Sequence, residues 1–144
     1  MDTIESARIF EWEDLEKGQK ESFEFSVSED DMRAFAKFSG DESRIHIDRD
    51  YALRNGFKGP VVYGAVLVSK LSYLVGMLLP GDYGLATDWR INFHRPLYTG
   101  DTASFLAELT HLSPATRNVR IKFTVEVAGT LIASGDAGST LLKP

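Results

Sequence analysis

The chain has 144 residues, of which 43% are hydrophobic and 26% charged, a balance typical of one globular domain with its own core. It contains no cysteine, which excludes disulfides, thiolate metal sites and a cysteine nucleophile. The net charge of −5 argues against sequence-independent nucleic-acid binding, which needs a positive field. The acidic N-terminus has no signal-peptide core, and the longest apolar run, 64–79, is too short to span a membrane. We therefore expect a cytoplasmic protein with neither nucleic acid nor membrane as a partner.

The first half of the chain predicts one strand followed by helices. Residues 23–27 alternate apolar and polar side chains, which is typical of a half-buried strand. Ser28 and the acidic residues after it predict the start of a helix, and Gly40 predicts its end. A polar loop over 41–46 comes next, and Asp48 is expected to cap a short helix. This order places the polar loop between two helices.

The second half changes from helical to alternating periodicity. Residues 64–79 are apolar almost all round, which predicts a long, buried central helix that Pro80-Gly81 terminates. Apolar residues then recur at every second position in four segments, each expected to be a strand: 89–93, 103–109, 119–127 and 131–137. Short turns between consecutive strands favour an antiparallel sheet. The sequence predicts a single α+β domain over 1–144, a sheet wrapped around one helix, with 1–12 as a loose N-terminal extension.

The candidate site residues lie in the polar loop and at the helix start that follows it. Asp41 and His46 are five residues apart, and a histidine beside a carboxylate can move a proton near neutral pH. Gly64 would begin the apolar helix, whose first N–H groups can polarise a carbonyl. On residues alone, the pattern favours a structural role for His46 in the loop, Asp41 could equally be a turn residue after Gly40, and Gly64 could serve only close helix packing. No spacing of His, Asp and Glu predicts a metal site.

From about Trp12 to Leu142 the chain resembles the MaoC-like hotdog-fold family, of the R-specific enoyl-CoA hydratase type. The family's loop reads Ser-Gly/Glu-Asp-x-Asn-Pro-Ile/Leu-His-x-Asp. It is followed by Gly-Phe-x-x-x-Ile/Val-x-His-Gly-Met, an apolar helix ending in Pro-Gly, and a strand reading Phe-x-x-Pro-Val, then Gly-Asp. The matching residues here are Ser39-Gly40-Asp41, Ile45-His46, Asp48, Gly56-Phe57, Gly59, Pro60, Val62, Gly64, Pro80-Gly81, Phe93, Pro96-Leu97 and Gly100-Asp101.

The resemblance implies a hydro-lyase that reversibly adds water, with syn geometry, to a trans-2-enoyl thioester to give the R-3-hydroxyacyl product. Asp41 and His46 would be the acid/base pair, and the Gly64 N–H would stabilise charge on the thioester carbonyl. Ser72 would orient Asp41, or else bond back to its own helix. The resemblance implies no cofactor, with CoA or an acyl-carrier protein as carrier of the substrate. It also implies a homodimer or higher oligomer that pairs open sheet edges and has ligand tunnels at the interface.

Three residues depart from the family pattern. Ser43 stands where Asn is usual, Arg44 where Pro is usual, and Tyr63 where His is usual. We expect Tyr63 to line the thioester pocket and alter the acyl preference, or else to be a packing residue only. The departures keep two alternatives open: a thioesterase on the same fold, in which a carboxylate activates water against the carbonyl, and a non-catalytic acyl-binding hotdog protein.

Overall fold

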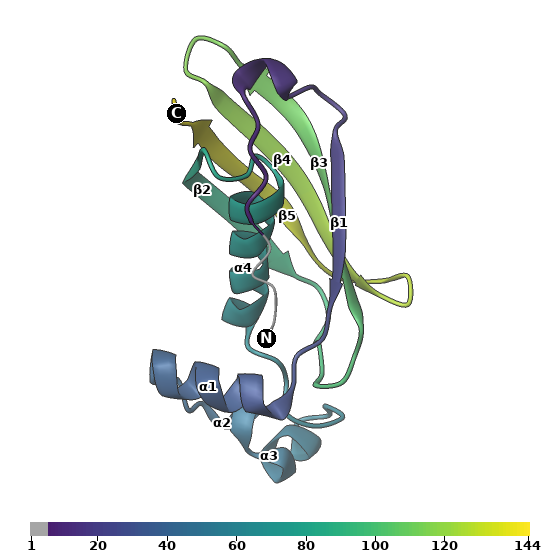
Figure 1. The fold of residues 1–144 in the computed structure, drawn as a ribbon. Helices are drawn as coiled ribbons and strands as arrows, with labels where there is room; N and C mark the ends of the chain where they lie inside the picture. Colours follow the sequence, from purple (N-terminus) through teal and green to yellow (C-terminus); the bar gives the residue numbers. More distant parts are fainter. Residues whose placement is uncertain (1–5) are drawn as a thin grey trace.

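The computed structural model describes residues 6–144, which form four α-helices, two short helical turns and five strands (Figure 1). Residues 1–5 of the expected N-terminal extension lie outside the described residues. In the rest of that extension, the N–H of Arg8 donates to the carbonyl of Met77 at 2.9 Å. The elements in chain order are η1 (Trp12–Asp14), β1 (Lys20–Phe25), α1 (Glu29–Ser39), α2 (Arg44–Ile47), α3 (Arg49–Arg54), α4 (Gly64–Tyr73), the π-helical turn η2 (Leu74–Leu78), β2 (Gly84–Phe93), β3 (Ala103–Ser113), β4 (Asn118–Val127) and β5 (Thr130–Leu141).

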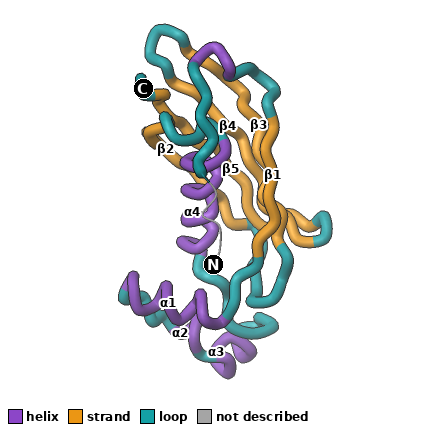
Figure 2. The backbone as a smooth tube through the Cα atoms, in the orientation of Figure 1, coloured by secondary structure: helices purple, strands orange, loops and turns teal. Residues whose placement is uncertain are grey.

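The five strands form one antiparallel sheet in the order β1-β3-β4-β5-β2. The strands β3, β4 and β5 follow one another through short turns, as the sequence predicts, while β1 and β2 form the two edges. Helix α4 lies against one face of the sheet, and α1, α2 and α3 gather at one end of the molecule (Figures 1 and 2). This arrangement confirms the expected α+β hotdog fold.

The core lies between α4 and the inner face of the sheet. Alternate residues of β3 and β4 point inward and are buried: Ala103, Phe105, Ala107, Leu109, Val119, Ile121, Phe123 and Val125. From the helical side, Leu67, Leu71 and Leu74 meet them and are at most 3% exposed. Each fully buried side chain of this size stabilises the fold by ~1.5–3 kcal/mol. This packing fixes α4 against the sheet, and with it the position of the helix start at Gly64.

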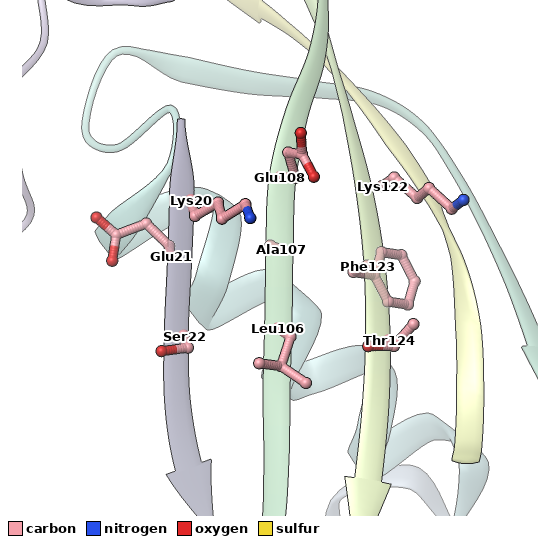
Figure 3. Close-up of a pocket in the computed structure, with 9 residues that line it drawn as sticks. All are labelled: Lys20, Glu21, Ser22, Leu106, Ala107, Glu108, Lys122, Phe123 and Thr124. Carbon is pink, nitrogen blue, oxygen red and sulfur yellow. The ribbon is translucent and has the colours of Figure 1, made fainter. Parts of the chain in front are cut away.

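The outer face of the sheet carries alternating charges. Residues at facing positions across all five strands form one row: Lys20, Glu108, Lys122, Asp136 and Arg90. Figure 3 shows part of this row beside a shallow hollow of about 500 Å³ lined by residues of β1, β3 and β4. Opposite charges at facing positions stabilise strand pairing. The exposed side chains of Lys20, Glu108 and Lys122 line this hollow, and neither Asp41 nor His46 does, so it lies on the solvent face of the sheet.

The predicted start and end of α1 and the predicted start of α3 are confirmed, whereas α4 ends at Tyr73 and a π-helical turn over Leu74–Leu78 follows it. The Ser28 side chain accepts from the N–H of Asp31 at 3.0 Å at the start of α1, and Gly40 ends that helix with φ of 77°. The Asp48 side chain accepts from the N–H of Tyr51 at 2.9 Å at the start of α3. These interactions satisfy N–H and C=O groups that a helix end leaves without partners.

Two local expectations differ from the structure. The segment expected to be a loop over 41–46 contains the short helix α2, because the Asp48 N–H bonds to the carbonyl of Arg44 at 2.8 Å. Helix α4 is not buried all round, since Ala65, Ser69 and Ser72 are exposed. A single sheet covers only one side of a helix, and small side chains occupy the side that the sheet leaves open. None of the helices within residues 6–144 is long and apolar enough to cross a membrane.

Candidate active site

Asp41 is held by residues next to it in the chain. Its N–H donates to the Ser39 hydroxyl at 3.0 Å, and its carboxylate accepts from the N–H of Ser43 at 3.0 Å. The Ser43 hydroxyl donates to the same carboxylate oxygen. This hydroxyl, together with the Ser43 N–H, lowers the pKa of Asp41 below its ordinary value, because both bonds favour the ionised form. Asp41 is therefore a carboxylate near neutral pH.

The imidazole of His46 projects from α2 and is half-buried. Its Nδ1 lies 2.6 Å from the carbonyl oxygen of Val61. A carbonyl can only accept, so Nδ1 carries the hydrogen, and in the neutral ring Nε2 is left as an acceptor. Val61 is also tied to this helix from its other side, because its N–H donates to the carbonyl of Ile45 at 3.0 Å. The segment before α4 thus fixes the orientation of a ring that can take up a proton at Nε2.

Tyr63 contacts both members of the Asp41 and His46 pair. Its hydroxyl donates to the backbone carbonyl of Asp41 at 2.6 Å, and its ring stacks on that of His46 with centroids 4.1 Å apart. The Tyr63 ring also contacts the ring of Phe35 in α1, with centroids 4.6 Å apart. The residue is only 1% exposed, and burial, followed by the nearby charge of Asp41, raises the pKa of its hydroxyl. The Tyr63 hydroxyl therefore stays protonated. Its buried side chain contacts both Asp41 and His46.

Gly64 is the first residue of α4, as the sequence predicts. The N–H of a first helical residue has no partner within the helix and lies at the positive end of the helix dipole. A Cβ at this position would lie 2.9 Å from Cζ of Phe93, so the absence of a side chain lets that ring approach the helix start. Phe93 comes from the end of β2 and is itself 54% exposed. The structure thus brings a ring from the edge strand to the predicted oxyanion donor.

Ser72 and Arg44 lie apart from the contacts that join Asp41, His46 and Tyr63. Ser72 lies on the exposed side of α4, and within residues 6–144 no hydrogen bond joins it to Asp41. The bond back to the preceding turn is made by Ser69, whose hydroxyl donates to the carbonyl of Val66 at 2.6 Å. The Arg44 guanidinium reaches Asp48 at 3.3 Å and lies 4.2 Å from the Tyr51 ring centroid. Arg44 therefore links α2 to α3.

Sequence reasoning missed three contributors to this site. The Val61 carbonyl fixes His46, but a backbone carbonyl has no residue-type signal that a sequence pattern could show. Phe35 belongs to the apolar positions of α1 and gave only a packing signal. The alternating pattern indicated only that Phe93 lies in a strand. Its match to the Phe of the family motif Phe-x-x-Pro-Val was the one signal that could have marked it as part of the site.

Comparison with known proteins agrees with this architecture. The family model described as MaoC like domain matches residues 13–132. The (R)-specific enoyl-CoA hydratase of Rhodospirillum rubrum is 31% identical over 133 residues, which cover 92% of this chain and 91% of the relative. The 3-hydroxybutyryl-CoA dehydratase of Methylorubrum extorquens is 29% identical over 130 residues, which cover 90% of this chain and 83% of the relative.

The same likeness extends to three dimensions. The solved structure of the (R)-hydratase from A. caviae matches with a TM-score of 0.84 and 29% identity, covering 88% of this chain and 97% of that one. The two curated relatives named above are hydro-lyases by their names. With the motif order, the hotdog fold and a family match over most of its length, the chain belongs to the MaoC-like family.

Proposed function

We propose that this protein reversibly adds water, with syn geometry, to a trans-2-enoyl thioester, giving the R-3-hydroxyacyl thioester. The observation that carries the proposal is the shared anchorage of Asp41 and His46. Tyr63 donates to the backbone carbonyl of the first and stacks on the ring of the second, so one buried side chain contacts both residues. The named activities of relatives at about 30% identity support the same reaction. CoA or an acyl-carrier protein would carry the substrate, and the reaction would need no cofactor.

In this reaction the acid/base pair binds a water molecule against C3 of the substrate. The ionised carboxylate of Asp41 and the Nε2 of a neutral His46 ring are both acceptors, so together they can take one proton as the oxygen bonds to C3. The pair returns that proton to C2 on the same face, so the net reaction adds OH to C3 and H to C2. The two groups act as a coupled pair, and the proton is assigned to the pair and not to either residue.

Gly64 would stabilise the negative charge that develops on the thioester oxygen during the addition. Its N–H lies at the start of α4, where the helix dipole favours negative charge. A fixed donor of this kind stabilises the transition state more than the ground state. Ser72 would contribute from the exposed side of the same helix, as part of the substrate-binding surface.

The direct test uses crotonyl-CoA and follows loss of the enoyl absorbance. Replacing Asp41→Asn or His46→Ala should each lower kcat by ~10² or more, because each removes a positioned acid/base group. Glu42→Gln is the matched control, since it changes an exposed carboxylate beside Asp41 and should leave kcat unaltered. Full activity in both Asp41→Asn and His46→Ala would refute the assignment, and release of free thiol in place of hydration would identify a thioesterase.

We further propose that the protein is a homodimer. Strand β2 is an edge of the sheet, and such an edge presents unpaired backbone groups. Leu85 and Phe93 on this strand are 55% and 54% exposed, and the open side of α4 carries small side chains. A second copy pairing along β2 would cover these groups and would place ligand tunnels between the copies.

A further inference from the structure

A second hollow lies at the end of the molecule that carries the acid/base pair. Its volume is about 500 Å³, and it lies between the segment before α4, the segment after β2 and the hairpin of β4 and β5. Three of its lining residues are cations: Arg49, Lys58 and Arg95. Three residues that carry hydroxyl groups, Tyr98, Thr99 and Thr130, also line it. The hollow is therefore rich in hydrogen-bond donors.

The three cations have no carboxylate partner within the part of the chain that the structure describes. All ion pairs within 4.0 Å there involve other basic residues. One guanidinium nitrogen of Arg95 donates to a backbone carbonyl at 3.1 Å, which leaves the rest of its fork unused. The one carboxylate in the lining, Asp101, accepts from the N–H of Tyr98 at 3.1 Å. Three cations against one carboxylate give a local positive field in a chain of net charge −5.

The chain segment that borders this hollow also contacts His46. Gly59 and Pro60 line the hollow, and the next residue, Val61, accepts from His46. Val61 also pairs with Tyr98, whose hydroxyl accepts from the N–H of Lys58 at 3.1 Å and keeps its own hydrogen to donate. One short segment thus fixes His46 on one side and bounds the cationic hollow on the other.

Glycine at position 59 brings one of the cations over this segment. A Cβ there would lie 3.1 Å from a guanidinium nitrogen of Arg49, so the guanidinium packs against a bare stretch of backbone. Arginine presents a planar set of donors that matches two phosphate oxygens at once, and lysine adds a point charge. The hollow therefore has the donors and the charge that a phosphate group requires.

We propose that this hollow binds the phosphate groups of coenzyme A. The inference rests on the proposed function, because a thioester substrate joins its acyl group to those phosphates through a flexible pantetheine arm. The phosphates must therefore bind near the acid/base pair but not at it, and the wall formed by Gly59, Pro60 and Val61 meets this requirement. Arg49, Lys58 and Arg95 would contact the phosphates, with the Tyr98 hydroxyl as an added donor.

The test compares two substrates that differ only in the nucleotide end: crotonyl-CoA and crotonyl-pantetheine. The double variant Arg49→Gln/Lys58→Gln removes two charges and spares Arg95, which also bonds to the backbone. We expect its KM for crotonyl-CoA to rise about tenfold or more, the scale of hydrogen bonds to charged groups. The kcat for both substrates and the KM for crotonyl-pantetheine should stay as in the unmodified protein. Added salt should raise the KM for crotonyl-CoA less in the variant than in the unmodified protein.

The matched control is Lys20→Gln/Lys122→Gln, which removes the same charge from the outer face of the sheet and should not change the KM for either substrate. An unchanged KM for crotonyl-CoA in the test variant, or an equal rise for both substrates, would overturn the proposal. Crotonyl-acyl-carrier protein serves as a third substrate, and a rise in KM confined to it would overturn the proposal in favour of that carrier. If the unmodified protein hydrates neither substrate, the proposed function fails. Calorimetry with adenosine 3′,5′-bisphosphate then still decides the site, which requires binding that the test variant weakens.

Discussion

Two of the three residues that depart from the family pattern contact Asp41. Ser43 donates to its carboxylate, and Tyr63 donates to its backbone carbonyl while stacking on His46. The third, Arg44, joins α2 to α3 through Asp48. At the scale of single residues, Ser43 and Tyr63 thus lie among the contacts that hold the proposed acid/base pair in place. Residues that differ from the family pattern, Ser43 and Tyr63, thus contact Asp41 and His46, which match it.

Removing the Tyr63 hydroxyl should weaken this positioning. We expect Tyr63→Phe to lower kcat about tenfold with little change in KM, because the ring stack remains while the bond to the Asp41 carbonyl is lost. Steady-state kinetics on crotonyl-CoA measure this split. Tyr83→Phe, elsewhere in the chain, serves as the control.

The family residue at this position supplies a further comparison. Tyr63→His should shift the chain-length or branching profile toward simple enoyl-CoA substrates, since a smaller ring changes the packing against Phe35 and His46. A panel of enoyl thioesters of graded length measures the shift. An identical profile in Tyr63→His, together with full activity in Tyr63→Phe, would mean that the residue only packs.

The pKa of Asp41 gives a pH prediction. The hydrogen bond from the Ser43 hydroxyl lowers this pKa, so the carboxylate stays ionised. The contribution of the ionised carboxylate to activity is lost only as pH falls through the lowered pKa. Ser43→Ala removes the largest cause and should raise the pKa toward its ordinary value. The acid limb of the kcat/KM profile should then move to higher pH. Ser22→Ala, on the outer face of the sheet, is the control, and an unmoved limb in Ser43→Ala would contradict the prediction.

At the scale of elements, the stability of α1 depends on the hydrogen bonds that cap its N-terminus. Ser28 caps it through the N–H of Asp31, whose side chain accepts in turn from the N–H of Ser28 at 2.9 Å. Ser28→Ala should lower the free energy of unfolding by ~1 kcal/mol, the usual cost of losing such a cap. Chemical denaturation measures the loss, and Ser26→Ala, an exposed serine just before the cap, should cost little. Equal stability of the two variants would show that the cap is dispensable.

The effect of the same variant on catalysis tests how α1 supports the site. The C-terminal end of α1 leads directly into Asp41, and Phe35 of this helix packs on the Tyr63 ring. Because the cap lies at the other end of the helix, its loss should reduce stability more than kcat.

At the scale of the whole molecule, the open β2 edge predicts assembly. At micromolar concentration the mass in solution should be twice that of the chain, as measured by light scattering or sedimentation. Leu85→Lys places a charge on the exposed edge and should promote dissociation, because edge lysines disfavour strand pairing. Leu106→Lys, an exposed leucine on the outer face of the sheet, is the matched control. A monomeric mass for the unmodified protein would contradict the proposed dimer.

The sequence by itself determined the features that depend on neighbouring residues. The cap at Ser28, the end at Gly40 and the alternation of the later strands follow from local hydrogen bonding and side-chain periodicity. The order of motifs around Asp41 and His46 identified the family. These features could be predicted because the interactions that form them lie within a few positions of one another.

Tertiary structure decided what depends on residues far apart in the chain. The bond from Tyr63 to Asp41, the carbonyl of Val61 on His46 and the ring of Phe93 over the start of α4 join separate segments. No local pattern encodes such contacts, because they exist only once the helices have packed on the end of the sheet. The open side of α4 has the same origin. Its sequence is apolar almost all round, and the topology of one sheet decides which side is covered.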